Sequence, residues 1–556
     1  MNKLSFNTRK ETIEKLTSET LDVLIIGGGI TGAGLALQAG AQDLNAGLIE
    51  MQDFAAGTSS RSTKLVHGGL RYLKQFEVEM VADITKEREV IYQNAPHIVQ
   101  PEKMLLPVYD EPGATFTDFS ADVALDLYDR LAEVDEDGAH EFISREEVLE
   151  DIPTLKKEGL LKGGLYLDYI NDDARLTIEI LKKASGLGTL LTNYVKGIGF
   201  LYNEDNQIIG VKAKDQMTDE VYEIHAKVVV NAAGPWSDEI RNKQKDENAD
   251  RMYPTKGVHF VVDSKKLPVK HTVYTDTGFE DNRMIFIIPR GDKTYFGTTD
   301  TPYEGEYANP GITEDDLEYL LQAVNNRFPG VNISFSDIES GWSGLRPLIL
   351  EEDATDASSI SRTHEVFVSD AGLVTIAGGK LTDYRLMAQD TFDMILSELT
   401  EKTGEFYEKV QTKNIRLSGG DVPNHQQFKK YINENIEKGL EIGLTEEQAK
   451  DLLDWYGSNA DTVFSLKEEA GKINLPLDIA LSLIYALKYE AAMTPVDFFL
   501  RRTDKLLFST EKVENWMTPV IDTMEKYIGW TPEQKVKHVE ELNETIANIQ
   551  LKTLRK

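Results

Sequence analysis

The sequence predicts an α/β protein with a parallel-sheet domain, an inserted antiparallel-sheet domain and a helical C-terminal domain. Three observations support this fold class. An apolar run near the N-terminus ends in a glycine-rich turn that opens a helical pattern. Short strand patterns with turn residues between them occupy residues 195–230 and 258–300. From about residue 400 onward, helix-forming residues dominate and strand patterns disappear.

The first elements form a β–α–β unit. Leu21–Ile26 is a short apolar run of the kind found in buried parallel strands. A helix is predicted over Ile30–Gln42, and a second strand over Ala46–Glu50. A parallel pair joined by a helix is the building unit of doubly wound α/β domains, so this segment starts the first domain.

The remaining pattern divides the chain into alternating pieces. Helices are predicted over 78–95, 175–188 and 381–398, and buried strands over 228–232 and 373–377. Short strands and acidic helices alternate over 105–170, and antiparallel strands are expected over 258–300. The first domain is therefore expected over 1–100, 171–250 and 344–398, the inserted sheet domain over 101–170 and 251–343, and the helical domain over 399–556.

Composition narrows the function. The chain has 556 residues, a formal net charge of −34 and no cysteine. A strongly acidic balance argues against a nucleic-acid partner, whose phosphates need a basic face. The lack of cysteine excludes disulfides, iron–sulfur clusters and thiolate zinc sites. Redox chemistry would need a bound organic cofactor, and we expect no metal; an anionic substrate would need a local cluster of Arg and Lys.

The N-terminal segment bears on localisation. Residues 1–20 are polar and mixed in charge, without the apolar stretch of a signal peptide. Residues 21–41 are apolar but carry six glycines and an aspartate, which fits a strand, a turn and a helix better than a membrane span. We expect a cytoplasmic protein. Peripheral contact with the inner face of the cell membrane remains compatible with the sequence, because it needs only a small apolar patch.

The glycine turn predicts a dinucleotide site. Gly27, Gly29 and Gly32 fit the G-x-G-x-x-G spacing directly after a strand and at the start of a helix. Gly27 permits the tight turn, Gly29 the approach of a pyrophosphate, and Gly32 close helix–sheet packing. Glu50 ends the next strand, where a carboxylate accepts hydrogen bonds from a ribose diol and repels a 2′-phosphate. NAD and FAD share this pattern, so both remain open at this point.

A later glycine pair favours a flavin. Gly378 and Gly379 follow the strand predicted at 373–377, and Lys380, Leu381 and Thr382 open the next helix. Free amides at a helix N-terminus stabilise the negative charge that a reduced flavin holds at N1. For the glycine pair taken alone, ordinary helix capping is the better explanation.

One long block carries a family resemblance. Gly57–Leu73 reads GTSSRSTKLVHGGLRYL, which resembles the FAD-dependent glycerol-3-phosphate dehydrogenases and the related α-glycerophosphate oxidases. The resemblance runs from about residue 20 to the C-terminal helices. Further matching stretches are Gly27–Gly34, Asp172–Leu176, Asn231–Trp236, Thr255–His259, Gly297–Asp300, Gly344–Leu348, Ile360–Arg362, Gly378–Arg385 and Phe498–Thr503.

The resemblance implies a glutathione-reductase-like (Rossmann-type) FAD-binding domain, an inserted antiparallel β-sheet substrate domain over the flavin and a helical C-terminal cap domain. It also implies that the segment from Thr58 to Leu70 lines FAD, with His67 near the ring system. The residues then expected at the cofactor, besides Gly27, Gly29, Gly32 and Glu50, are Thr58, Ser59, Ser60, Lys64, Leu65, His67, Gly68, Gly69, Gly234, Gly379, Leu381 and Thr382.

The resemblance further implies oxidation of glycerol 3-phosphate to dihydroxyacetone phosphate. A phosphate dianion needs several cationic donors, and Arg offers a bidentate fork. The candidates lie in the matching motifs: Arg71, Arg346, Arg362 and Lys380. His259 is our candidate for the base that takes the hydroxyl proton, with a buried structural histidine as the alternative. Tyr72 and Thr299 are candidates for orienting contacts.

The two main hypotheses, a dehydrogenase and an oxidase, differ in the electron acceptor. A dehydrogenase would pass electrons to a quinone, whereas an oxidase would pass them to O2 and make hydrogen peroxide. Streptococcal-type oxidases carry a long insert where this chain has only Ile349–Ile360, which favours the dehydrogenase, although Pro519–Gln534 is more similar to the oxidases. An amino-acid or amine flavin oxidase of the same fold is a remoter alternative. A homodimer and covalent attachment of FAD are left open.

Overall fold

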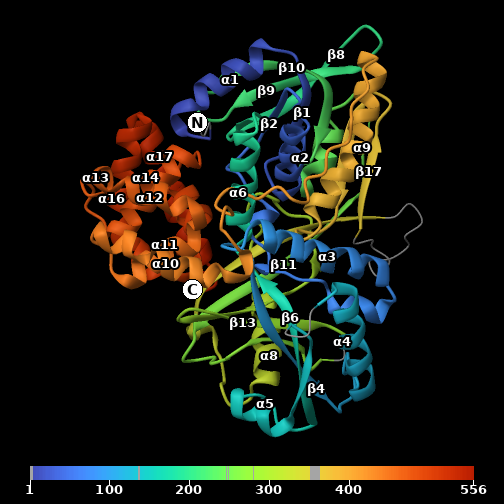
Figure 1. Ribbon diagram of the computed structural model, residues 1–556, viewed down its shortest axis with the longest axis vertical. Coiled ribbons are helices and arrows are strands. Elements are labelled where there is room, and N and C mark those ends of the chain that lie inside the picture. Colours follow the sequence, from blue (N-terminus) through green and yellow to red (C-terminus); the bar gives the residue numbers. More distant parts are fainter. Residues whose placement is uncertain are drawn as a thin grey trace.

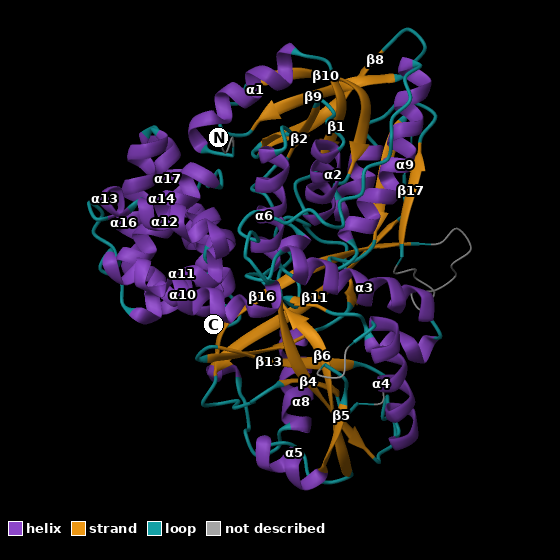
Figure 2. Ribbon diagram, viewed as in Figure 1, coloured by secondary structure: helices purple, strands orange, loops and turns teal. Residues whose placement is uncertain are grey.

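The computed structural model describes residues 4–134, 138–245, 247, 249–279, 281–350 and 363–555. Within these residues the chain forms two β-sheets, flanking helices and a group of helices near the C-terminus (Figures 1 and 2). The predicted order of element types is confirmed. No helix in the described part of the chain is both long and apolar enough to cross a membrane.

The first sheet is built around parallel strands. β18, β10, β1, β2 and β7 lie side by side in this order and run parallel, and β17 pairs antiparallel with β18 at the edge. β1 spans the predicted Leu21–Ile26, and β2 ends one residue before the predicted limit. The strands of this sheet are β1 (Leu21–Ile26), β2 (Ala46–Ile49), β7 (Leu190–Thr192), β8 (Val195–Tyr202), β9 (Ile208–Asp215), β10 (Val221–Asn231), β17 (His364–Val368) and β18 (Leu373–Gly378).

The second sheet is mostly antiparallel and lies below the first in the view of Figure 1. Its longest pairings join β11 to β16 and β4 to β6. The domain boundary predicted at residue 343 falls inside β16; the other boundaries stay predictions. The strands of this sheet are β3 (Leu65–Val66), β4 (Gln100–Tyr109), β5 (Glu141–Ser144), β6 (Leu160–Ile170), β11 (Met252–Asp263), β12 (Thr272–Asp276), β13 (Met284–Arg290), β14 (Lys293–Gly297), β15 (Thr301–Pro302) and β16 (Ile338–Ile349).

Helix α2 packs against the first sheet between two other helices, α6 and α9. A Cβ atom on Gly34 would stand 2.8 Å from the Tyr384 ring of α9, and one on Gly40 would stand 2.9 Å from the Leu187 side chain after α6. The small residues of α2 therefore allow this close packing. The helices outside the C-terminal region are α1 (Arg9–Ser18), α2 (Ile30–Ala41), α3 (Val78–Asn94), α4 (Asp118–Ala132), α5 (Arg145–Asp151), α6 (Asp173–Gly186), α7 (Ser237–Arg241), α8 (Glu314–Arg327) and α9 (Tyr384–Thr403).

The C-terminal helices form a separate group beside α6 (Figure 1). Their apolar faces share one buried cluster that extends to side chains of the second sheet. A π-helical turn, η9 (Asp497–Arg502), lies between α14 and α15 and contacts α6. The helices are α10 (Phe428–Glu441), α11 (Glu446–Tyr456), α12 (Ala460–Ser465), α13 (Lys467–Ala470), α14 (Leu477–Tyr489), α15 (Lys505–Phe508), α16 (Thr510–Ile528) and α17 (Pro532–Ile549).

Candidate active site

The glycine turn between β1 and α2 is too crowded for side chains. Gly27 has a φ of +116°, and a Cβ atom on it would stand 2.4 Å from the backbone oxygen of Ala232. A Cβ atom on Gly32 would stand 1.9 Å from the backbone oxygen of Gly27. Gly29 precedes the first residue of α2, so the helix N-terminus opens at this turn. Its amides and dipole favour phosphate groups.

Glu50 follows β2 and lies against the turn. One carboxylate oxygen accepts a hydrogen bond from the Gly28 amide at 2.6 Å, and the other accepts one from the Gln52 amide at 2.8 Å. Burial raises the pKa of the Glu50 carboxyl, while the two amides act in the opposite direction. The position matches that of an acid that receives a ribose diol in dinucleotide sites.

A cavity begins at the carboxyl ends of the parallel strands, where open α/β sheets bind their ligands. Its empty volume is about 1780 Å³, open solvent at its mouth included. Ile26, Ile49, Ala232 and Gly378, which lie at or next to the ends of four strands, contribute to its wall. The wall also includes Thr58, Ser59, Ser62, Thr63, Leu65, His67 and Tyr72 from the long block that carries the family resemblance.

The structure brings together most of the residues predicted at the site. Those that line the cavity are Gly27, Gly29, Glu50, Thr58, Ser59, Leu65, His67, Tyr72, Gly234, Arg346, Gly379, Lys380, Leu381 and Thr382. Gly32, Ser60, Lys64, Gly68, Gly69, Arg71, His259 and Thr299 are not part of its wall. Arg362 lies outside the described residues.

Two residues of the block are turned away from the cavity by other contacts. Lys64 is 1% exposed, and its Nζ atom lies 2.6 Å from Oδ1 of Asp173 at the start of α6. The Gly68 amide donates to the Tyr128 hydroxyl at 2.8 Å, and a Cβ atom on Gly68 would stand 2.3 Å from Thr85. Both residues therefore support the block from behind.

His259 lies on β11 behind the cavity wall. Its ring stacks on Trp342 with centroids 4.8 Å apart, and Nε2 lies 3.0 Å from the hydroxyl oxygen of Thr63, a wall residue. Burial lowers the pKa of His259 to about 3, with the positive charges of Arg346 and Lys64 adding to the effect. The ring is neutral at pH 7, and it reaches the cavity only through Thr63.

His67 reaches the cavity directly. Its ring lies edge-on to the Phe286 ring, with the two ring centroids 5.6 Å apart. Burial lowers the pKa of His67, so the imidazole is neutral near pH 7. Asp168 opposes that shift. A half-buried, neutral imidazole at a cavity wall is suited to accept a proton from a substrate hydroxyl.

Two of the cations in the same wall, Arg346 and Lys380, were predicted from the sequence. Arg346 of β16 contacts Asp300 through Nη1 at 3.1 Å and the backbone oxygen of Thr299 through Nη2 at 3.2 Å. Lys380 lies over the Tyr72 ring, with Nζ 3.9 Å from the ring centroid. Arg346 belongs to the second sheet and Lys380 follows β18 of the first sheet, so both sheets contribute cations to the cavity wall.

Sequence reasoning missed a group of wall residues at the Glu50 end. They lie outside the motifs: two directly follow Glu50, and the others come from the start of β8 and from α7 and the turn after it. The Val195 amide donates to the backbone oxygen of Glu50 at 2.7 Å, which draws the start of β8 to the site. The missed residues are Met51, Gln52, Val195, Lys196, Gly197, Glu239, Ile240 and Lys243.

Comparison with known proteins agrees with this geometry. The family described as FAD dependent oxidoreductase matches residues 22–385, and the C-terminal domain of alpha-glycerophosphate oxidase matches residues 410–535. The chain is similar to an alpha-glycerophosphate oxidase of Streptococcus pyogenes, 46% identical over 605 aligned positions that cover 99% of each chain. It is equally similar to the aerobic glycerol-3-phosphate dehydrogenase of Bacillus subtilis, 46% identical over 542 positions that cover 97% of each.

A solved structure extends the likeness to three dimensions. The glycerol-3-phosphate dehydrogenase from Bacillus halodurans complexed with FAD superposes with a TM-score of 0.83 and 40% identity, covering 98% of each chain. This confirms the predicted fold class and the predicted cofactor. The chain therefore belongs to the FAD-dependent oxidoreductase family, in its branch of glycerol-3-phosphate dehydrogenases and α-glycerophosphate oxidases.

Proposed function

We propose that this protein oxidises sn-glycerol 3-phosphate at C2 to dihydroxyacetone phosphate, with FAD as its cofactor. The observation that carries the proposal is one cavity that joins a dinucleotide-binding turn to a neutral histidine and two cations, His67, Arg346 and Lys380. The names of full-length relatives at 46% identity support the same substrate.

The residues present fit FAD. The turn around Gly27 admits a pyrophosphate because it carries no side chains, and Glu50 can accept hydrogen bonds from the ribose. Gly378 and Gly379, both with a φ of +76°, also line the cavity and lead to the start of α9. When bound, FAD supplies the acceptor for the hydride that leaves C2 of the substrate.

The chain's own residues then bind the substrate and move its proton. Arg346 offers a guanidinium fork to the substrate phosphate, and Lys380 adds a second positive charge in the same wall. We assign the base to His67, whose ring lies at the cavity, and give His259 the role of holding Thr63. Arg71, in the turn that carries Tyr72, stays a candidate for phosphate contact.

We further propose a quinone as the electron acceptor. The alignment with the streptococcal oxidase is longer than the 556 residues of this chain, so that oxidase carries residues that this chain lacks, whereas the alignment with the Bacillus dehydrogenase is shorter. Transfer to O2 is the second candidate, supported by the match of the C-terminal region to the oxidase domain.

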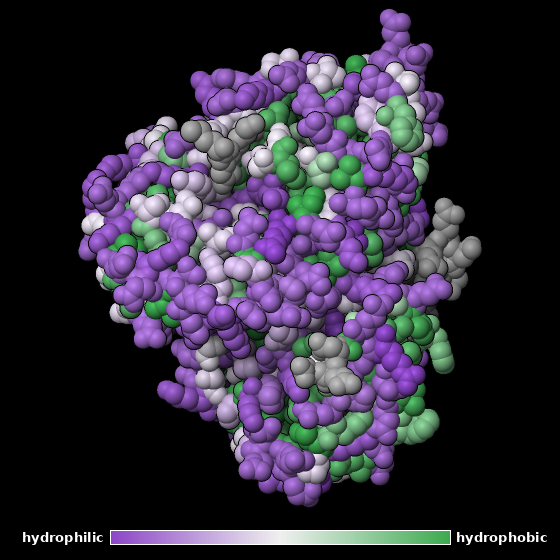
Figure 3. Space-filling view, in the orientation of Figure 1, coloured by the Kyte–Doolittle hydropathy of each residue, from purple (hydrophilic) through white to green (hydrophobic). Residues whose placement is uncertain are grey.

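An apolar patch supports contact with a membrane that holds the quinone. Phe76 is 88% exposed and Phe119 is 77% exposed, and Val123 is exposed one turn further along α4. Figure 3 shows apolar side chains over α4 at the lower right of the molecule. The turn that ends before Phe76 also carries Tyr72 of the cavity wall, so the patch adjoins the element that borders the site.

Anaerobic mixing of the FAD-loaded protein with glycerol 3-phosphate tests the proposal. Flavin absorbance should bleach in a stopped-flow instrument, and it should return rapidly with an added quinone and slowly with air. If the band does not bleach, glycerol 3-phosphate is not the substrate. Bleaching with glycine or proline would then support the amine-oxidase hypothesis. Rapid return in air with peroxide would assign the oxidase activity instead.

A further inference from the structure

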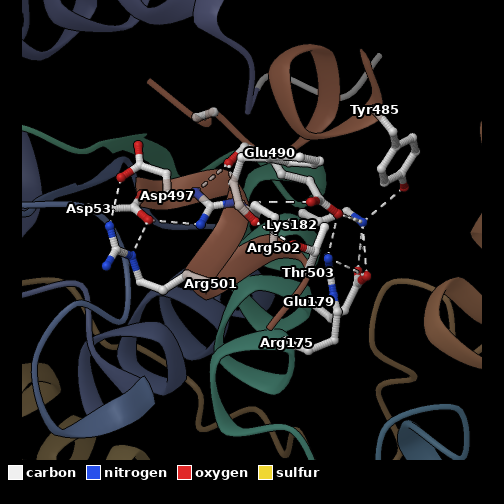
Figure 4. A network of polar contacts seen from close by, with 12 residues as sticks. Asp53, Arg175, Glu179, Lys182, Tyr485, Glu490, Asp497, Arg501, Arg502 and Thr503 are labelled. Atoms are coloured by element: carbon white, nitrogen blue, oxygen red, sulfur yellow. Dashed lines mark hydrogen bonds and ion pairs between the residues drawn. The ribbon is translucent and has the colours of Figure 1, made fainter. Parts of the chain in front are cut away.

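No residue of the Phe498–Thr503 stretch lines the cavity, yet both of its arginines contact the segment that follows Glu50. Arg501 and Arg502 belong to the π-helical turn η9 in the C-terminal region. Both contact Asp53, three residues after Glu50 (Figure 4). Consecutive residues of a regular helix point about 100° apart. Here the two neighbouring side chains converge on a single carboxylate.

Asp53 is completely buried and has both oxygens occupied. Arg501 donates through Nε at 2.6 Å, and Arg502 donates through Nη1 at 2.8 Å and Nη2 at 2.9 Å, one bond to each oxygen. Asn193 adds a bond at 3.0 Å. The arginines bring the pKa of Asp53 down to about 2 against the opposing effect of burial. Arg502 and Asp53 therefore form a bidentate ion pair that is shielded from solvent. Such a pair tolerates little change in the positions of its two side chains.

The cofactor loop, residues 50–57, has two faces. Glu50, Met51, Gln52, Ala56 and Gly57 line the cavity, whereas the segment 53–55 between them does not. The loop thus presents one face to the cofactor and the other to the C-terminal region through Asp53.

The middle of the cofactor loop also supports the phosphate turn. A Cβ atom on Gly28 would stand 2.8 Å from the buried Phe54 ring, and the Ala55 amide donates to the Gly28 oxygen at 3.0 Å. Ala55 has a φ of +62°, in the left-handed region that an alanine rarely adopts. Such a conformation persists when its surroundings hold it in place. Asp53, two residues earlier, is held in place by its ion pairs with Arg501 and Arg502.

We propose that Arg501 and Arg502 of the C-terminal region position the cofactor loop through Asp53 and thereby set the affinity of the protein for FAD. The three residues are positioning residues, because none of them lines the cavity. The proposal rests on FAD as the cofactor of the proposed function. It makes the C-terminal helices part of cofactor retention in addition to any role as a cap.

The same buried network offers a matched control. Glu179 of α6 is fully buried and bonds to Arg175 and Lys182, but it contacts none of Asp53, Arg501 and Arg502 (Figure 4). Glu179→Gln therefore disturbs an ion pair of the same depth without touching the cofactor loop. Arg502→Lys keeps the charge beside Asp53 and removes the bidentate geometry.

The test is FAD release from the full-length holoenzyme. Each variant is diluted in steps, and the fluorescence of free FAD at equilibrium gives a dissociation constant, with thermal unfolding measured in parallel. Arg502→Lys and Asp53→Asn should raise the FAD dissociation constant at least tenfold, and Glu179→Gln should lower the melting temperature while the constant stays within twofold of wild type.

If the FAD dissociation constant of Arg502→Lys stays within twofold of wild type, the proposal is wrong, whatever the melting temperature of this variant. If Asp53→Asn does not fold, Arg502→Lys alone decides the matter. The measurement needs no substrate. Failure of the wild-type protein to oxidise glycerol 3-phosphate would therefore remove the proposed substrate and leave this result unaffected.

Discussion

The Nε2 atom of His259 lies 3.0 Å from the hydroxyl oxygen of Thr63, so this histidine contacts the cavity wall from behind. His67, in contrast, is itself part of the wall. One histidine therefore belongs to the cavity wall, and the other contacts that wall through Thr63. Their substitution should have different effects on the reaction.

His67→Ala should slow flavin reduction by glycerol 3-phosphate by a factor of about 10² to 10⁴, the usual contribution of a general base. His259→Ala should slow it much less, because its ring acts only through Thr63. Anaerobic stopped-flow absorbance at saturating substrate measures both rates. Equal losses in the two variants would return His259 to the position of base.

The reduction rate should depend on pH through the same imidazole. Burial lowers the pKa of His67 below its ordinary value of 6.5, so the ring stays neutral until the pH falls below that value. We expect the wild-type rate to be flat across neutral pH and to decline only in more acidic solution, as the base becomes protonated. A decline that begins above pH 7 would contradict this assignment. The rate remaining in His67→Ala should lack the acidic limb.

Arg346→Ala should weaken substrate binding. Loss of hydrogen bonds to a charged group costs about 1.5–3 kcal/mol, which corresponds to a rise of roughly 10- to 100-fold in the apparent substrate constant. FAD content should stay at the wild-type level. Arg130→Ala on α4 is the control, because that side chain is 75% exposed and pairs with Asp126 of the same helix. An unchanged substrate constant would remove Arg346 from the phosphate site.

Gly32→Ala should abolish FAD binding or folding. Its Cβ atom would stand 1.9 Å from a backbone oxygen, and backbone cannot move aside without deforming the turn at Gly27. Gly186→Ala, at the end of α6, is the matched control, since nothing lies within 4 Å of the added atom. The flavin absorbance of the purified proteins distinguishes them. A yellow, FAD-loaded Gly32→Ala protein would show that the turn tolerates a side chain.

Asp53 should contribute to stability only above acidic pH. Its carboxyl has a pKa of about 2 in the folded protein against an ordinary 3.8, so its contribution is complete above the unfolded value and is lost as the pH falls towards 2. The shift corresponds to roughly 2 kcal/mol. Urea unfolding at pH 6 and pH 3 should show a smaller stability gap between wild type and Asp53→Asn at the lower pH. A constant gap would mean that the pair contributes no pH-dependent stability.

The apolar patch should bind lipid. Phe76→Ser with Phe119→Ser should reduce co-sedimentation with vesicles of zwitterionic lipid and slow reoxidation by a quinone held in them, while turnover with a water-soluble acceptor stays the same. The net charge of −34 should weaken binding to anionic vesicles, and added salt should reduce that repulsion. Wild-type protein that stays in the supernatant with every vesicle would argue against this surface.

Local sequence pattern was sufficient for the elements to which we assign the nucleotide part of the cofactor. β1 and the start of α2 fall where the apolar run and the glycine spacing place them, because a tight turn between a buried strand and a helix admits few residue types. The family motifs likewise indicated Arg346 and Lys380, and both lie in the cavity wall.

Tertiary structure decided which side chains face the cavity. Lys64 and His67 are three residues apart in one motif, yet Asp173 holds the first away from the cavity and the second lines it. A hydrogen bond from the Val195 amide to the Glu50 oxygen brings Lys196 of β8 to the wall, and His259 contacts Thr63 from behind that wall. A short-range pattern constrains backbone conformation, whereas the direction of a side chain depends on partners that are hundreds of residues away. For the same reason, only the folded chain shows the contact of Arg502 with Asp53.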